Sequence, residues 1–87
     1  MKNCVYILYC RDARYYIGST TDLSIRIKQH RQGKVMSTKK RRPLRIVFSQ
    51  EFKTKHEAHR MELWIKKQKS RKLLEQIIVD KIIKKKL

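Results

Sequence analysis

The sequence has no long hydrophobic run. The apolar stretch near its start, at residues 4–9, is six residues long, whereas a membrane-spanning helix needs about 20. The stretch also lacks the small-residue cleavage site of a signal peptide, so we interpret it as a buried β-strand. We therefore expect no membrane span.

Cysteines are equally few, since the chain contains only Cys4 and Cys10. Six positions of extended strand, at about 3.3 Å each, put their α-carbons about 20 Å apart, too far for the roughly 4.4–6.8 Å of a disulfide. No CxxC or HxxxH pair indicates a zinc site. We expect two buried free thiols, which are typical of a reducing compartment, and hence a cytoplasmic protein.

Acidic residues are scarce as well. Seven Asp and Glu oppose 24 Lys and Arg, which gives a net charge of +17. A compact domain with this imbalance repels itself unless a polyanion screens it. Nucleic acid, an anionic membrane surface or an acidic protein could do so, and a lysine-rich surface that serves only solubility is the alternative. Counterion release from phosphates favours nucleic acid among these partners.

The length of 87 residues has room for one domain, and no repeat or flexible linker divides it. β-Branched and aromatic runs predict strands, and apolar periodicity predicts helices. The expected elements are strands at 4–9 and 15–17, a helix at 22–31, a strand at 45–52, and helices at 54–68 and about 70–86. This order, β-β-α-β-α-α, indicates a single α+β domain over residues 1–87, with a small sheet and the last helix packed on the rest.

Capping residues support the predicted helix boundaries. Asp22 ends a Ser-Thr-Thr-Asp cluster before the first helix, and Gly33 follows that helix as a C-terminal cap. Thr54 and Glu57 fit a capping box at the start of the second helix. The last helix is expected to begin at Ser70 and to end in three lysines, where the helix dipole favours cations.

Residues 34–44 show no hydrophobic periodicity, so we expect an exposed basic loop. The loop carries a run of four cations just before Pro43. These are the candidate nucleic-acid-binding residues: Lys39, Lys40, Arg41 and Arg42.

The first helix carries polar residues on the face that the fold should bury, and function is best sought at such positions. Arg26 and His30 share the side of Leu23 and Ile27, at spacings of three and four residues. An arginine beside a packing stripe could equally be extending its charged head to water.

The second helix presents a sharper anomaly. Glu62 falls within an apolar stripe formed by Ala58, Met61 and Ile65. Either Glu62 pairs with a neighbouring base or it holds a cation, and the spacing alone leaves both interpretations open.

Two strand tyrosines complete a set of polar groups. Tyr6 lies in the middle of the first strand and Tyr16 begins the second, where each could simply pack in the core and hydrogen-bond through its hydroxyl. Two phenols, an arginine, a histidine and a carboxylate nevertheless suit phosphodiester cleavage. A phenol can deprotonate water if cations lower its pKa, and an arginine can stabilise the charged transition state.

These residues resemble the GIY-YIG endonuclease family, in particular its small stand-alone bacterial members. Val5-Tyr6 followed by Tyr16-Ile17-Gly18 resembles the paired motif that names the family, although the first motif reads Cys4-Val5-Tyr6 in place of Gly-Ile-Tyr. The resemblance nearly spans the chain and continues through Asp22-Leu23, Arg26, His30, Gly33, Arg42-Pro43-Leu44, Glu57-Ala58, Glu62 and Ile65-Lys66.

The resemblance implies a three-stranded antiparallel sheet flanked by helices, and metal-dependent hydrolysis of DNA phosphodiester bonds. Tyr6 and Tyr16 would shape the nucleophile and its base. Arg26 would contact the scissile phosphate, and His30 could assist proton transfer. Glu62 would anchor one divalent cation, Mg²⁺ or Mn²⁺. The absence of any base-reading helix favours recognition of backbone and shape over sequence.

Two other functions are compatible with the same residues. The domain could bind DNA or RNA without cleaving it, or it could be a nuclease that needs a protein partner for targeting. The last helix, with isoleucines beside lysines, could also be an amphipathic membrane or protein-docking element, although packing on the domain is the simpler interpretation.

Overall fold

The computed structural model describes residues 2–87 and confirms the predicted order β-β-α-β-α-α. A short 3₁₀ helix, η1, is added between α1 and β3. The elements are β1 (Asn3–Cys10), β2 (Tyr15–Thr20), α1 (Leu23–Arg31), η1 (Lys39–Arg41), β3 (Leu44–Phe52), α2 (Lys55–Gln68) and α3 (Arg71–Asp80).

The three strands form one antiparallel sheet, as predicted, and their order across the sheet is β2-β1-β3. The central strand β1 is covered on both faces, which explains its continuous apolar sequence. Its residue Tyr6 is paired with Gly18 of β2 on one side and with Ser49 of β3 on the other. β2 is therefore an edge strand, because no strand within residues 2–87 pairs with its other side.

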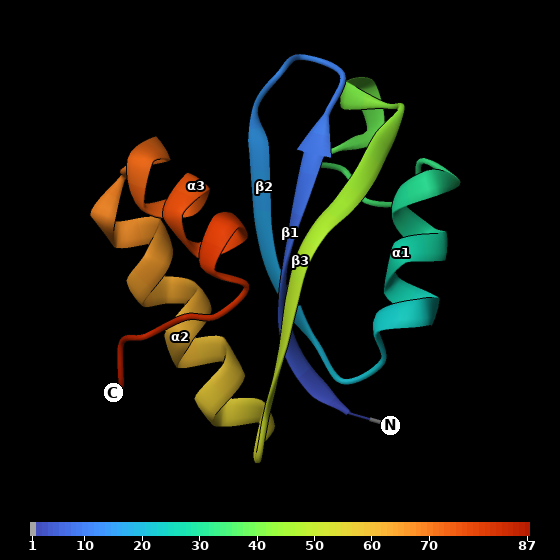
Figure 1. Cartoon of the computed structure of the whole chain (residues 1–87). Helices are drawn as coiled ribbons and strands as arrows, with labels where there is room; N and C mark the ends of the chain where they lie inside the picture. Colours follow the sequence, from blue (N-terminus) through green and yellow to red (C-terminus); the bar gives the residue numbers. More distant parts are fainter. Residues whose placement is uncertain (1) are drawn as a thin grey trace.

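Helices cover the two faces of this sheet unequally (Figure 1): α1 lies on one face, and α2 and α3 lie on the other. Val5 and Ile7 of β1 belong to the core cluster that includes Met61 of α2 and Ile77 of α3. The alternate residues of β1, namely Tyr6, Leu8 and Cys10, face α1 and form a smaller cluster with Ile27 of that helix. Both cysteines are buried and free, as expected.

The predicted capping residues begin the helices. Asp22, Thr54 and Ser70 adopt extended backbone angles, and each side chain accepts a hydrogen bond from a backbone N–H of the first turn. Gly33 follows α1 with φ of 76°, the left-handed conformation that glycine adopts readily. Among residues 2–87, no helix combines the length and the apolar character needed to cross a membrane.

The last helix is shorter than predicted, because α3 ends at Asp80 rather than near residue 86. Lys81 turns into the left-handed conformation, with φ of 60°, and donates its N–H to Ile77 at 2.8 Å. Beyond this turn Ile83 is buried in the core, and its N–H donates to the side chain of Gln50 at 2.8 Å. The prediction that the three terminal lysines stand at the end of a helix was therefore wrong.

Two other boundaries also differ from expectation. β2 continues through Ser19 and Thr20, which the sequence pattern had assigned to the capping cluster. The loop at residues 34–44 is not wholly exposed, because Val35 and Thr38 are buried. Neither the end of β2 nor the buried loop residues could be predicted, because these short polar and basic stretches have no periodic apolar pattern.

Candidate active site

Tyr6 is buried at the centre of β1, and its ring lies across the backbone of Gly18 on β2. A Cβ atom at position 18 would lie 2.5 Å from the Tyr6 hydroxyl oxygen and 2.6 Å from Cζ. Both are far below van der Waals contact, so only glycine accommodates the ring. The glycine of the second motif thus provides space for the tyrosine of the first.

The hydroxyl of Tyr6 is hydrogen-bonded to His30 of α1. Tyr6 Oη lies 2.8 Å from His30 Nε2, and His30 Nδ1 lies 2.8 Å from Thr38 Oγ1. All three side chains are fully buried. Burial and, to a lesser degree, the positive charge of Arg26 lower the pKa of His30 to about 4, so the imidazole is neutral at pH 7. Burial also raises the pKa of Tyr6 to about 12, against the opposing influence of Arg26.

Tyr16 and Arg26 adjoin this buried pair. The Tyr16 ring centroid lies 6.3 Å from that of Tyr6 and 5.0 Å from that of His30. The pKa of Arg26 is raised, first by its side-chain hydrogen-bonding interaction with Tyr6 and further by the two phenol groups. Arg26 is half-buried, and its Nη1 also donates to Gln29 Oε1 at 3.1 Å. The guanidinium thus adjoins both phenols and remains partly accessible.

Glu62 approaches from α2, on the other face of the sheet. The residue is 8% exposed, and its carboxylate accepts hydrogen bonds from Ser19 Oγ and Lys66 Nζ, both at 2.6 Å. His59 Nδ1 lies 3.7 Å from the same carboxylate. Lys66 Nζ also lies 5.8 Å from the centroid of the Tyr16 ring. Lys66 therefore connects the carboxylate of Glu62 with the ring of Tyr16.

The five candidate catalytic residues meet around the β2 edge of the sheet. Tyr6, Arg26 and His30 come from the α1 side, Glu62 comes from the α2 side, and Tyr16 stands on β2 between them. This arrangement brings cationic, phenolic and carboxylate groups together from both faces. A phosphodiester at this edge could contact all three chemistries.

Glu62 is the carboxylate that could hold a metal in this region. Among the described residues, no group of three or more His, Cys, Asp or Glu side chains is arranged to bind an ion. Mg²⁺ is commonly held by one or two carboxylates, with water and substrate phosphate completing its coordination. Glu62 fits that mode only if Lys66 leaves the oxygen that it now contacts.

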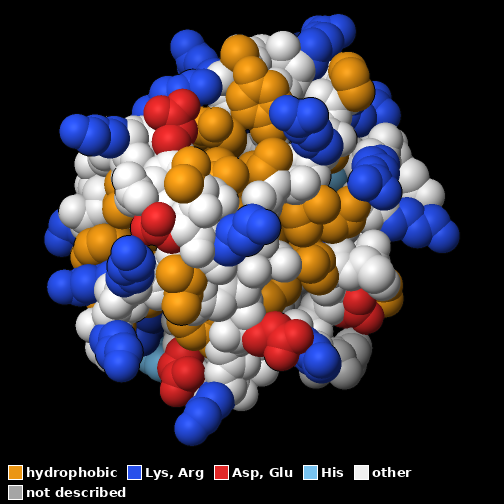
Figure 2. Space-filling view, viewed as in Figure 1, with side chains coloured by type: hydrophobic (Ala, Val, Ile, Leu, Met, Phe, Trp, Pro, Cys, Tyr) orange, Lys and Arg blue, Asp and Glu red, His pale blue; other side chains and the backbone are white. Residues whose placement is uncertain are grey.

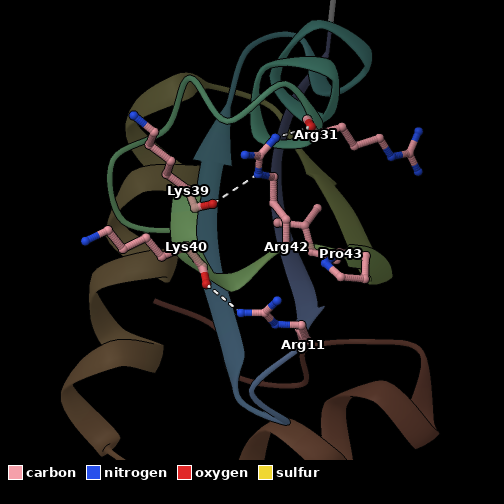
Figure 3. Close-up of a pocket in the computed structure, with 7 residues that line it drawn as sticks. Arg11, Arg31, Lys39, Lys40, Arg42 and Pro43 are labelled. Atoms are coloured by element: carbon pink, nitrogen blue, oxygen red, sulfur yellow. Dashed lines mark hydrogen bonds between the residues drawn. The ribbon is translucent and has the colours of Figure 1, made fainter.

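The predicted nucleic-acid-binding run divides into two pairs of residues. Lys39 and Lys40 extend their ammonium groups away from the loop (Figure 3). Arg41 instead pairs with Asp12 at 2.8 Å. Arg42 donates to two backbone carbonyls, those of Arg31 and Lys39, at 3.1 and 3.0 Å. The two lysines are therefore available for a ligand, whereas the two arginines hold the loop in place.

This loop borders an open basic groove of about 830 Å³ at one end of the sheet. The lining residues are Arg11, Arg31, Lys39, Lys40, Arg42, Pro43 and Leu44. A second, smaller pocket of about 170 Å³ lies between β2 and the α2–α3 junction, and its cations are Arg14, Lys66, Lys69 and Arg71. No acidic side chain lines either cavity. Lys and Arg side chains also lie around the rim of the face seen in Figure 2, with acidic and hydrophobic side chains between them.

Four residues of the site were not singled out from the sequence: Gly18, Ser19, Thr38 and Lys66. Lys66 had a signal, because it lies four positions after Glu62 on a helix, the spacing of an ion pair. Gly18 and Lys66 were noted only as parts of the motifs that carry the family resemblance. Ser19 and Thr38 reach their partners through the tertiary fold and had no local signal.

Residues 2–75 match the sequence profile of the GIY-YIG catalytic domain. The chain is 38% identical over 82 residues to a UPF0213 protein of Limosilactobacillus reuteri, covering 91% of this chain and 84% of the relative. It is 41% identical over 69 residues to a UPF0213 protein of Streptococcus pneumoniae, covering 78% and 70%. A solution NMR structure of the UPF0213 protein BH0048 from Bacillus halodurans is also similar, with a TM-score of 0.59 and 43% identity over 93% of this chain and 86% of that one.

Proposed function

The chain belongs to the GIY-YIG catalytic domain family, and from this membership we propose that it is a metal-dependent endonuclease that hydrolyses phosphodiester bonds of DNA. The observation that supports the proposal most directly is the meeting of five side chains at the β2 edge. The buried Tyr6–His30 pair, the half-buried Arg26 and the carboxylate of Glu62 lie around Tyr16. A binding module would need neither the buried pair nor the carboxylate.

The proposed chemistry assigns a separate task to each group. Arg26 would stabilise the negative charge that develops on the attacked phosphate, and its bifurcated donors suit phosphate oxygens. Tyr6 and Tyr16 would shape the position of the attacking water, and one of the two phenols, ionised once the substrate is bound, would accept its proton. His30, neutral and hydrogen-bonded to Tyr6, would hold that phenol in position.

Glu62 would hold one divalent cation, Mg²⁺ or Mn²⁺, with substrate oxygens completing its coordination. When bound, the ion would supply Lewis-acid stabilisation of the phosphate. Lys66 would neutralise Glu62 in the free protein and would turn toward a phosphate once the ion is bound. Its ammonium already lies between the carboxylate and the Tyr16 ring, so a rotation of the side chain is sufficient.

Binding would depend on backbone charge rather than on base sequence. Lys39 and Lys40 extend from the loop, and further cations line the small pocket beside Lys66. Each neutralised phosphate should contribute a slope of about −0.9 to the logarithmic dependence of affinity on salt. A protein partner would then be needed only to direct the domain to its target.

The test is cleavage of labelled single-stranded, duplex, flapped and branched DNA with Mg²⁺, Mn²⁺ or EDTA. Glu62→Gln keeps the shape of the side chain and an acceptor for Ser19, but it removes the charge that would hold the ion. The matched control is Glu57→Gln, which changes an exposed glutamate in the first turn of the same helix. We expect cleavage by the wild type and the control, and DNA binding without turnover by Glu62→Gln.

A non-catalytic nucleic-acid-binding function is the second candidate. The observation that favours it is the 2.6 Å contact between Lys66 and Glu62, which leaves the carboxylate neutralised without a metal. Binding of DNA or RNA with no metal-dependent cleavage of any substrate would support this function. Equal cleavage by Glu62→Gln and the wild type would instead remove Glu62 from the proposed mechanism.

A further inference from the structure

The small pocket between β2 and the α2–α3 junction, called the edge pocket from here on, collects cations from separate segments of the chain. These are Arg14 of the β1–β2 hairpin, Lys66 and Lys69 at the end of α2, and Arg71 at the start of α3. No acidic side chain lines the edge pocket. Cations that converge in this way repel one another, so the pocket is suited to an anion that screens them.

Two of these four cations have no partner within the described part of the protein. Lys66 bonds to Glu62, while Arg71 donates to a hairpin carbonyl at 2.7 Å and lies 3.4 Å from a glutamate of its own helix. Among the hydrogen bonds and ion pairs of residues 2–87, none involves the side chain of Arg14 or Lys69. Both are exposed, so they are free to contact an anion that enters the pocket.

The floor of the edge pocket is apolar, which suits a nucleotide better than a simple inorganic ion. Its apolar lining residues are buried or half-buried, whereas the cations around them are exposed: Tyr15, Ile17, Ile65 and Leu74. A phosphate can meet the cations while the attached sugar covers the apolar floor. A nucleic-acid strand presents both groups at every nucleotide, and an inorganic anion presents charge alone.

The edge pocket adjoins the carboxylate proposed to hold the metal. Lys66 lines the pocket, and its Nζ lies 2.6 Å from Oε2 of Glu62 and 5.8 Å from the centroid of the Tyr16 ring. Lys66 and Lys69 follow Glu62 on α2 at about 6 and 10 Å along the helix axis. One strand of a duplex carries a phosphate every 3.4 Å of its axis, so the pocket lies about two or three phosphates from Glu62.

We propose that the edge pocket is a subsite for a backbone phosphate of the strand that is cleaved, with Arg14 and Lys69 as its contacts. The inference rests on the proposed nuclease function for the identity of that strand. A strand held here follows the β2 edge from Glu62 toward the hairpin. The subsite thereby sets which phosphate of the strand meets the candidate catalytic residues, without reading any base.

The first test measures binding without cleavage, with labelled duplex and single-stranded oligonucleotides in EDTA at several salt concentrations. Arg14→Gln and Lys69→Gln should each reduce the slope of log affinity against log salt by about 0.7 to 0.9. The matched control is Lys67→Gln, which removes the same charge from an exposed lysine of α2 outside the pocket and should keep the wild-type slope. Slopes of the two pocket variants equal to that of the control would overturn the proposal, whether or not the protein cleaves DNA.

The second test locates the subsite relative to the cleaved bond. A neutral methylphosphonate replaces one phosphate at a time in a cleaved oligonucleotide. When it stands two or three positions to one side of the cleaved bond, kcat/KM of the wild type should fall about two- to fivefold, as for loss of an exposed ion pair. In the double variant Arg14→Gln, Lys69→Gln the same replacement should have no further effect. Equal losses in both proteins at every position would overturn the proposal.

Inorganic phosphate alone tests whether the pocket takes any anion rather than a strand. Its binding is followed by the backbone amide NMR signals of Lys69 and Ser70, which border the pocket. We expect these signals to shift at far lower concentrations of oligonucleotide than of inorganic phosphate. Equal affinity for the two would overturn the assignment to a strand. Because this titration and the salt dependence need no turnover, failure of the nuclease function is distinguishable from failure of the subsite.

Discussion

Gly18→Ala tests the packing of the site with the smallest change that the chain allows. The added Cβ would lie 2.5 Å from the Tyr6 hydroxyl oxygen, whereas ordinary contact begins at 3.4 Å, so the phenol must move by about 0.9 Å. A shift of this size exceeds what the 2.8 Å bond to His30 tolerates, because hydrogen bonds fail near 3.6 Å. We expect a loss of about 1–3 kcal/mol in the free energy of unfolding from overpacking. We also expect cleavage to be lost.

Urea denaturation of four proteins separates this clash from a general effect of alanine. The proteins are the wild type, Gly18→Ala, Tyr6→Ala and the double variant, which form a double-mutant cycle. Without the Tyr6 ring the new methyl group has space, and alanine in a strand is favoured over glycine by roughly 0.5–1 kcal/mol. Gly18→Ala should therefore stabilise the Tyr6→Ala protein. The same destabilisation in both backgrounds would show that contact with Tyr6 is not the cause.

Three further changes probe charge and metal binding. Lys66→Met removes the cation from Glu62, so Mg²⁺ should raise the melting temperature of this variant more than that of the wild type; equal shifts would exclude competition between lysine and metal. His30 has a folded pKa of about 4 against an ordinary value of 6.5, so the unfolded chain binds its proton first and stability should fall as pH drops from 6.5 to 4, by roughly 3 kcal/mol in total. His30→Gln should remove this component from denaturation curves, whereas His56→Gln should retain it. Lys40→Ala should reduce the slope of DNA affinity against salt by about 0.9, and an unchanged slope would exclude Lys40 as a phosphate contact.

Much of the fold was predictable because its signals are local. The apolar run of β1, the capping residues Asp22 and Thr54, and Gly33 after α1 each act within a few positions of the chain. The end of α3 was not predictable in the same way. Its isoleucine periodicity continues beyond Asp80, but burial of Ile83 against the rest of the domain turns the chain out of the helix.

The same distinction between local signals and tertiary packing applies to the candidate site. Motif resemblance identified residues that the structure brings together, including Tyr6 and Glu62, although their sequence separation gives no geometric information. Ser19 contacts Glu62 across 43 positions, and that contact exists only because β2 packs beside α2. Thr38 stands in a loop whose composition indicated exposure. Local patterns describe elements, whereas these hydrogen bonds depend on how the elements pack.

The smaller core cluster, on the α1 face, is built in part from the residues proposed to act in the reaction. Tyr6 packs there with Leu8 and Ile27, and His30 and Thr38 are buried beside it. In a substitution scan that records protein abundance separately from DNA cleavage, changes at Tyr6, His30 and Thr38 should therefore lower both. Arg26, which is half-buried, should fail in cleavage alone. A descendant of this protein that lost its activity would still be selected to keep the tyrosine, the histidine and the threonine for stability. The arginine would be the first of these residues to be substituted.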